Sequence, residues 1–188
     1  MSNETNTTPV GAVMIVGGGI AGIQASLDLA ESGYLIYLVE RKGSIGGRMS
    51  QLDKTFPTND CSMCMISPKL IGVASHPNIK IITKAELINL EGEPGRFKAI
   101  VQKHPRYVDE GKCVGCGICA QKCPAKVEDA FNQGLNKRKA VYLLYPQAVP
   151  LIYEIDRDHC IYFKNGRCRA CEKFCKNNAI DFNQKPEQ

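Results

Sequence analysis

The cysteines of the segment KCVGCGICAQKCPAK constrain the fold of this chain more than any other feature. Cys113, Cys116, Cys119 and Cys123 are separated by two, two and three residues, and Pro124 follows directly. Two-residue spacers let a loop wrap around one iron–sulfur cubane so that three thiolates reach its irons, while the fourth cysteine points toward a neighbouring cluster. The spacing therefore predicts a [4Fe-4S] cluster and a fold built around it.

A second group of cysteines lies downstream, with the spacing C-x7-C-x2-C-x3-C. It resembles the second half of two-cluster ferredoxins, and that resemblance implies that the two groups exchange one ligand each. One [4Fe-4S] cluster would be held by Cys113, Cys116, Cys119 and Cys175, and the other by Cys160, Cys168, Cys171 and Cys123. The long first spacer, and Lys176 where proline is more common, depart from the ferredoxin pattern.

Zinc and disulfides are the alternatives for the ten cysteines. Zinc sites pair cysteines two by two across a long gap and seldom use a third ligand two residues on. The amino-terminal end lacks the order of a secretory signal, and no stretch approaches the roughly 20 apolar residues of a membrane span. We therefore expect a cytoplasmic protein with reduced thiols and no direct membrane span, in which iron–sulfur clusters are favoured.

The charge of the chain fits a negatively charged cofactor better than nucleic acid. The formal charge is +5, but the basic residues are spread along the chain among 19 acidic ones. An oxidised cluster with four thiolates carries about two negative charges, so two clusters offset most of this excess. Basic residues near the cysteines are candidate partners of that charge: Lys112, Lys122, Lys126, Arg167, Arg169, Lys173 and Lys176.

A glycine motif near the amino terminus predicts a dinucleotide site. Residues 12–16 are typical of a buried parallel strand, a helix is expected to stop near Gly33, and a second strand over residues 34–39 ends at Glu40. Between the first strand and the helix, the chain reads Gly17, Gly18, Gly19, Ile20, Ala21, Gly22. In this arrangement the glycines permit a tight turn, the helix N-terminus faces a pyrophosphate, and the acid accepts hydrogen bonds from a ribose.

A second glycine motif favours FAD over NAD, which remains the alternative. Gly46, Gly47 and Arg48 follow shortly after Glu40 and Arg41. This motif resembles the second glycine motif of two-dinucleotide-binding flavoproteins, where it lies along the FAD diphosphate. The candidate FAD-binding residues are therefore both glycine motifs with these flanking residues.

The segments GGRMSQLDKTFPTNDCSMCMISPKL and KRKAVYLLYPQAVPLIY, with the cysteine motif between them, resemble the iron–sulfur flavoprotein subunit of heterodisulfide reductases. The resemblance runs from about residue 11 to the carboxyl end. It implies an α/β fold in which a thioredoxin-reductase-like, Rossmann-like FAD domain carries an inserted α+β ferredoxin-like domain with two [4Fe-4S] clusters. We expect a disordered arm at residues 1–9, a partial FAD-binding domain at 10–107 and the two-cluster domain at 108–188.

The same resemblance implies an oxidoreductase component that works in a complex. In the family, electrons pass from the flavin to clusters and partner subunits, in some members by bifurcation. Family chains continue into further flavin-domain strands that this sequence lacks, so a chain completing the FAD domain is an expected partner, and we expect weak FAD binding without it. The alternative is a non-catalytic electron-relay or assembly module.

Two further cysteines, Cys61 and Cys64, stand in NDCSMCMISPK. By the family resemblance they lie close to the flavin. Their spacing allows a redox dithiol or two ligands of a further cluster, with a pair of packed thiols as the alternative. A helix is expected from Lys69 to about Ala74.

The remaining segments predict connecting structure. Two β-rich runs, residues 79–90 and 96–103, are separated by a Gly- and Pro-containing turn. Residues 127–156 separate the two cysteine groups by more than a minimal ferredoxin needs. Their tyrosines and prolines favour a docking role.

Overall fold

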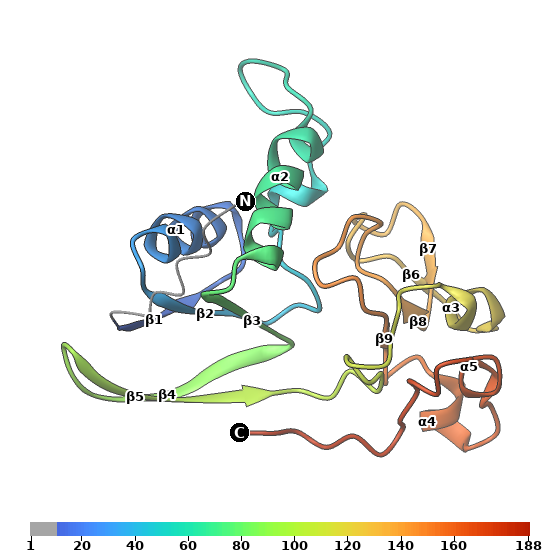
Figure 1. The fold of residues 1–188 in the computed structure, drawn as a ribbon. Coiled ribbons are helices and arrows are strands. Elements are labelled where there is room, and N and C mark those ends of the chain that lie inside the picture. The colour runs from blue at the N-terminus through green and yellow to red at the C-terminus, as the bar shows by residue number, and fades with distance from the viewer. Residues whose placement is uncertain (1–10) are drawn as a thin grey trace, which may run out of the picture.

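The computed structural model describes residues 11–188 as two units joined side by side. The first contains the glycine motifs and the second contains the eight cysteines of the ferredoxin-like pattern (Figure 1). The arm predicted at residues 1–9 lies outside the described residues. Within them, no helix combines the length and apolar character needed to cross a bilayer.

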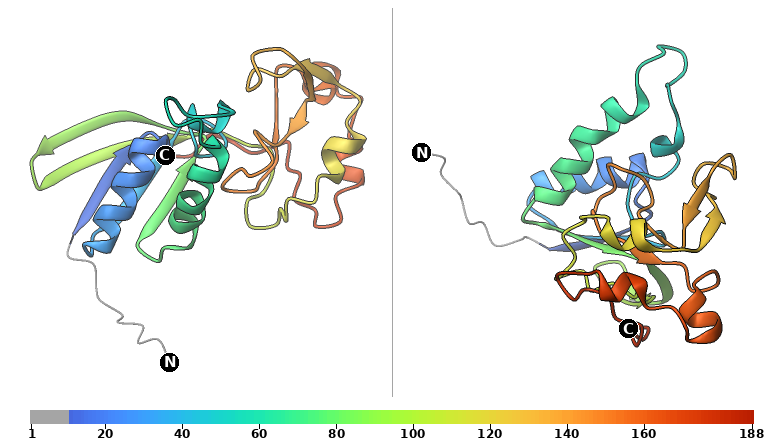
Figure 2. Two further views of the ribbon diagram at one scale, coloured as in Figure 1. Left: turned by 90° about the horizontal axis from the view of Figure 1, so that it is seen from above. Right: turned by 90° about the vertical axis from the view of Figure 1, so that its right-hand side faces the viewer.

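The first unit is a three-stranded parallel sheet with helices on one face (Figures 1 and 2). Its elements are β1 (Ala12–Val16), α1 (Ile20–Glu31), β2 (Leu35–Glu40), the short helix η1 (Met49–Gln51), α2 (Ser62–Ser75) and β3 (Ile79–Thr83). The strand order is β1-β2-β3, with Met14 opposite Tyr37 and Leu38 opposite Ile81. This confirms the predicted α/β class and its Rossmann-like βαβ start.

The β-rich run predicted over residues 79–90 is two strands, not one. Lys84 has a φ of 57° and separates β3 from β4 (Ala85–Glu93). A left-handed residue turns the chain out of the parallel sheet, so β4 pairs instead with β5 (Arg96–Lys103) in an antiparallel hairpin. The hairpin extends beneath the sheet, on the side away from α1 and α2 (Figure 1).

Helix α2 begins seven residues earlier than predicted, and Pro68 lies inside it. The buried residues Ser62, Ile66, Leu70 and Val73 have helical spacing on both sides of the proline. Pro68 is exposed, so its missing N–H affects one solvent-facing backbone bond while the buried face stays continuous. Burial therefore outweighs the preference of proline for a helix start.

The second unit has short elements around a core that contains cysteine. They are α3 (Ile118–Lys122), β6 (Lys126–Glu128), β7 (Lys137–Lys139), β8 (Val141–Tyr142), β9 (Glu154–Ile155), α4 (Ile161–Asn165) and α5 (Ala170–Lys173). The strands form two antiparallel pairs, β6 with β7 and β8 with β9. The buried residues include Cys119, Cys123, Cys160 and Cys171. Thiols thus occupy positions that aliphatic side chains fill in ordinary cores.

A segment of the second unit packs into the core of the first. Tyr145 and Ala148 are buried in the same cluster as Ile23 and Ile45. The Tyr145 hydroxyl donates a 2.5 Å hydrogen bond to the Ile45 carbonyl, and the Ile45 N–H donates to the Val149 carbonyl at 2.8 Å. The docking expected of this region therefore takes place within the chain.

Buried charges also join the two units. The Arg106 guanidinium, 3% exposed, donates to the Gly43 carbonyl at 2.8 Å and to the Thr83 hydroxyl at 2.5 Å. Lys84 pairs with the buried Glu154 at 2.9 Å. The guanidinium also donates across the boundary to the Ile152 carbonyl at 3.4 Å, and the Lys84–Glu154 pair crosses it too. Separating the units would therefore leave the buried Glu154 carboxylate without its partner.

Two substitutions at Tyr145 should separate the contribution of its hydrogen bond to stability from that of its ring packing. We expect Tyr145→Phe to lower the free energy of unfolding by about 1 kcal/mol, because one buried hydrogen bond is lost. Tyr145→Ala should lower it by about 3–5 kcal/mol, because the ring packing is lost as well. Urea unfolding of cluster-loaded protein without oxygen measures both. Leu135→Ala, at a side chain that is 83% exposed, is the control and should change little.

Candidate cofactor sites

The first glycine loop is shaped by positions where a side chain cannot fit. A Cβ on Gly22 would overlap the Gly17 carbonyl oxygen, so helix α1 approaches the strand end through a glycine. Gly17 has a φ of 110°, and nothing lies within 4 Å of a Cβ placed on Gly17 or Gly19. The loop therefore has a closed side against the helix and an open side of bare backbone.

The second glycine motif lies directly on the first. The Gly46 N–H donates to the Gly18 carbonyl at 2.7 Å, and a Cβ on Gly47 would lie 2.8 Å from the Gly19 Cα. Gly46 and Gly47 both have positive φ, 124° and 57°, which favours glycine at these positions. The structure thus brings together two loops that stand more than twenty residues apart in the sequence.

Glu40 holds the first loop in place. Its carboxylate accepts hydrogen bonds from the Gly18 N–H at 2.7 Å and the Lys42 N–H at 2.8 Å, and the residue is 8% exposed. Arg41 and Arg48 are exposed beside the two loops in sequence. The role of Glu40 toward a ribose stays a prediction, because the observed bonds go to backbone.

These residues fit the diphosphate of FAD. Helix α1 begins directly after Gly19, with no side-chain cap and no acidic residue in its first turn. Its N-terminal N–H groups are therefore available to an anion, and Ile20 and Ala21 at this end are exposed. The open side of the loop lets the phosphates approach the backbone closely.

The first predicted cluster set surrounds one cavity of about 270 Å³. Cys113, Cys116, Cys119 and Cys175 all line it. The Ala179 N–H donates to the Cys175 sulfur at 3.3 Å. The donor set fits a cubane, since four thiols from two distant segments face the same space.

The second predicted set lines a separate and smaller cavity of about 10 Å³. Its lining includes Cys123, Cys160, Cys168 and Cys171. The four thiols again suit a cubane, but the walls of this cavity must move outward to admit one. Among residues 11–188, no three or more His, Cys, Asp or Glu side chains stand close enough to share one metal ion.

Burial keeps the innermost thiols protonated without a metal. It raises the pKa of Cys119 to about 11 and that of Cys171 to about 12, and neighbouring cysteines add to both shifts. For Cys119 these neighbours are Cys113, Cys116 and Cys175. Iron binding would have to displace these protons, which couples cluster assembly to proton release.

Several of the basic residues named as charge partners are already paired. The Lys112 Nζ lies 3.1 Å from the Asp109 Oδ2, and the Arg169 Nε lies 2.5 Å from the Glu172 Oε2. Lys176 lines the first cavity. Lys139, which is not among those residues, donates a hydrogen bond to the Cys123 carbonyl at 2.7 Å.

Sequence reasoning missed two side chains at the first cysteine loop. Tyr153 lines the first cavity, and its hydroxyl lies 2.9 Å from where a Cβ on Gly117 would stand. Leu151 similarly lies 2.9 Å from a Cβ on Gly115. Both glycines also have positive φ, 68° at Gly115 and 78° at Gly117. The glycines of the cysteine motif were the available signal.

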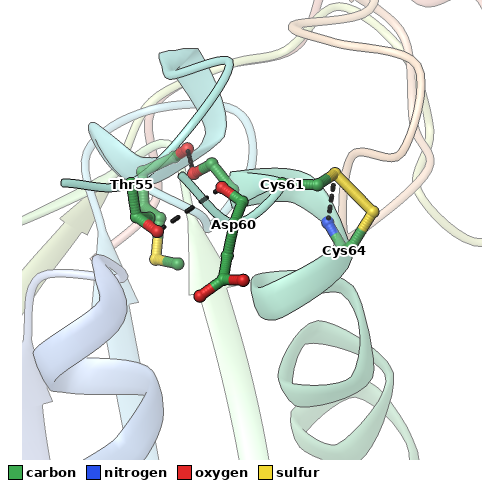
Figure 3. The surroundings of a disulfide bond; sticks show 6 residues. Thr55, Asp60, Cys61 and Cys64 are labelled. Carbon is green, nitrogen blue, oxygen red and sulfur yellow. Dashed lines mark hydrogen bonds between the residues drawn. A yellow bond between two sulfur atoms is a disulfide. The ribbon is translucent and has the colours of Figure 1, made fainter. Parts of the chain in front are cut away.

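Cys61 and Cys64 are joined by a disulfide at the start of α2 (Figure 3), so the expectation of reduced thiols is wrong for this pair. Both residues are exposed, so they are not a pair of packed thiols. Neither lines the cavities of the other eight cysteines.

Comparisons with known proteins agree with these sites. A family model described as FAD dependent oxidoreductase matches residues 12–62, and one described as 4Fe-4S binding domain matches residues 106–127. These matches confirm an FAD-binding oxidoreductase domain and a 4Fe-4S binding domain. The number of clusters and their ligands stay predictions.

Curated relatives cover most of the chain. It is 55% identical over 175 residues to a CoB–CoM heterodisulfide reductase iron-sulfur subunit of Methanocaldococcus jannaschii, covering 93% of this chain and 26% of that protein. It is 51% identical to a CoB–CoM heterodisulfide reductase iron-sulfur subunit of Methanopyrus kandleri, covering 94% and 26%. A heterodisulfide reductase subunit-like protein of Archaeoglobus profundus is 49% identical, covering 90% and 26%. The chain spans about a quarter of the length of these relatives, and the resemblance inferred from the motifs is confirmed.

Alanine at two glycines should separate folding from FAD binding. We expect Gly22→Ala to lower both stability and FAD affinity, because its Cβ would overlap a carbonyl oxygen. Gly19→Ala should leave stability unchanged but weaken FAD binding by about tenfold, or about 1.4 kcal/mol, because its Cβ fills the open side. Thermal unfolding and flavin fluorescence titration measure the two effects.

Gly11→Ala is the matched control, since the nearest atom to its Cβ is 3.7 Å away. It should change neither quantity. Wild-type FAD affinity in Gly19→Ala would show that the phosphates do not approach this side of the loop.

Proposed function

We propose, from the premise that this chain is a homologue of the heterodisulfide reductase iron–sulfur subunit over 93% of its length, that it is part of an iron–sulfur flavoprotein. In this proposal it binds FAD and two [4Fe-4S] clusters and passes electrons between them and partner subunits. It acts as an oxidoreductase within a complex, and a further chain segment completes the flavin domain.

One observation carries this proposal. Each four-cysteine set implied by the ferredoxin resemblance lines its own cavity, and the two sets exchange Cys123 and Cys175 between the halves of the unit. Cys123 and Cys175 are 52 residues apart in the chain (175 minus 123). If each half bound its own cluster, each of these cysteines would be expected to line the cavity of its own half and not that of the other.

The chain supplies binding and positioning, while the cofactors supply electron-transfer chemistry: a flavin takes up two electrons, and each cluster carries one. The two glycine loops would hold the diphosphate with backbone N–H groups. The Ala179 N–H, which donates to the Cys175 sulfur at 3.3 Å, would stabilise the thiolate and raise the potential of that cluster. The buried thiol positions would exclude water from the inner side of each cluster.

A single segment fixes the distance between the sites. The Val149 carbonyl accepts the Ile45 N–H beside the glycine loop, and the Ser44 hydroxyl donates to the Pro150 carbonyl at 3.4 Å. The next residue, Leu151, lies against Gly115 in the first cysteine loop. The cluster held by Cys113, Cys116, Cys119 and Cys175 is therefore proposed as the one nearer the flavin domain.

The exposed edge of the sheet supports a completing partner. Within residues 11–188, β1 pairs with β2 alone, and Val16 at its end is 58% exposed. An open edge next to the glycine loop can accept further strands by backbone pairing. The proposal includes electron bifurcation, in which the flavin of the completed domain passes its two electrons to two different acceptors.

Cofactor analysis tests the proposed function. The chain should be purified without oxygen, alone and together with its completing partner, and assayed for flavin, iron and acid-labile sulfide. We expect about eight irons per chain in both preparations, with tight FAD only in the complex, and reduction of both absorbance bands by dithionite. Iron without flavin in the complex would favour the electron-relay or assembly module, and zinc without iron would overturn the proposal.

Paired serine variants test the exchange of ligands. Cys113→Ser with Cys175→Ser should remove one cluster, leaving about four irons per chain, because both thiols belong to one set. Cys123→Ser with Cys175→Ser should remove both clusters, because one thiol is lost from each. If each half instead held its own cluster, the first pair would lose both clusters. Iron and sulfide content per folded chain measures the outcome.

A further inference from the structure

Cys61 and Cys64 differ from the eight other cysteines of the described chain. Several of those eight share the same C-x2-C spacing, for example Cys116 with Cys119, yet all are free thiols. Among residues 11–188, the Cys61–Cys64 pair at the start of α2 is the only C-x2-C pair joined by a disulfide. Spacing alone therefore does not produce the bond.

The backbone around the disulfide is held by hydrogen bonds of a buried residue, while both cysteines are exposed residues. Ser62, between the cysteines, is buried, and its hydroxyl donates to the Met49 carbonyl at 2.6 Å. The Ser62 N–H donates to the Asp53 carbonyl at 3.1 Å. Cys61 and Cys64 themselves are exposed. An external thiol or disulfide can therefore approach the Cys61–Cys64 bond, while the Ser62 hydrogen bonds hold the backbone around it.

The first turn of α2 makes the two cysteines unequal. Cys61 is the N-cap residue of this 14-residue helix, and its sulfur accepts a hydrogen bond from the Cys64 N–H at 3.2 Å (Figure 3). The first turn contains no acidic residue, and the preceding Asp60 carboxylate accepts a 2.5 Å hydrogen bond from Thr58. Helix N-terminal N–H groups stabilise negative charge, so in the reduced form Cys61 is the better thiolate.

We propose that Cys61 and Cys64 are a redox-active couple that exchanges two electrons with an external disulfide or dithiol, with Cys61 as the attacking sulfur. In the reduced form, the Cys61 thiolate attacks one sulfur of an external disulfide, forms a mixed disulfide and releases one thiolate. The Cys64 thiolate then attacks the Cys61 sulfur, closes the Cys61–Cys64 bond and releases the second thiolate. The external disulfide is reduced to two thiols, the protein dithiol is oxidised, and an external dithiol reverses both steps.

Single serine variants of the cluster-loaded protein test the order of attack. Oxidised glutathione and oxidised thioredoxin are the two probes, offered separately to the reduced protein without oxygen. We expect Cys64→Ser to form a mixed disulfide at Cys61 at least about fivefold faster than Cys61→Ser forms one at Cys64. Intact-mass and peptide analysis measure both rates. Equal or reversed rates would overturn the assignment of Cys61.

The two probes separate a small-molecule partner from a protein partner. Reaction with either one supports the couple and identifies the source of the disulfide, whereas reaction with neither overturns it. Wild-type protein provides an independent readout, because the fraction of Cys61–Cys64 disulfide should change reversibly with the ratio of dithiol to disulfide in the buffer. Cys116, exposed and in the same spacing, is the internal control and should stay unmodified in cluster-loaded protein.

Iron content distinguishes the couple from ligands of a further cluster. The double variant Cys61→Ser with Cys64→Ser should keep the wild-type iron content, both alone and with the completing partner. A loss of about four irons per chain would identify the pair as cluster ligands and overturn the proposal. This result does not depend on whether the ferredoxin-like sets exchange ligands, so the two proposals fail separately.

Discussion

The convergence of thiols from the two halves of the second unit is the constraint on which the structure depends most. The strands of this unit, β6 to β9, are two or three residues long, and its helices have four or five. Elements this short bury little surface of their own. Cys119 and Cys171 occupy core positions, and burial keeps their thiols neutral. In the proposed function, iron ligation at these positions supplies the stability that a small aliphatic core does not.

The segment between the two cysteine groups gives the molecule its organisation. Tyr145 fills the core of the flavin-type unit, Val149 bonds to the loop beside the glycines, and Leu151 supports the first cysteine loop. Buried Arg106 and Glu154 reinforce the same boundary. Because one continuous stretch touches both candidate sites, their separation is set by packed side chains and not by a flexible linker. In the proposed function, this packing would hold the two cofactors at one distance from each other.

The ten cysteines of the chain lie in different surroundings, and these surroundings favour either the neutral thiol or the thiolate. Cys119 is surrounded by other thiols and apolar walls, which favours the neutral form until a metal binds. Cys61 caps an exposed helix end, where backbone N–H groups favour the thiolate. The proposed clusters and the proposed disulfide couple therefore use different surroundings, although both begin from a C-x2-C spacing.

The sequence by itself determined the βαβ start, the two cofactor classes and the family, because glycine and cysteine spacings are local requirements of turns and cubanes. It did not determine that Lys84 divides one β-rich run, because a left-handed backbone at a lysine has no sequence signal. It also did not determine that α2 continues through Pro68, because there the buried helix face overrides local preference. Contacts such as Tyr145 with Ile45 and Gly47 with Gly19 join residues far apart in the chain. Only the tertiary structure decided them, since they depend on how two units pack and not on any neighbouring residues.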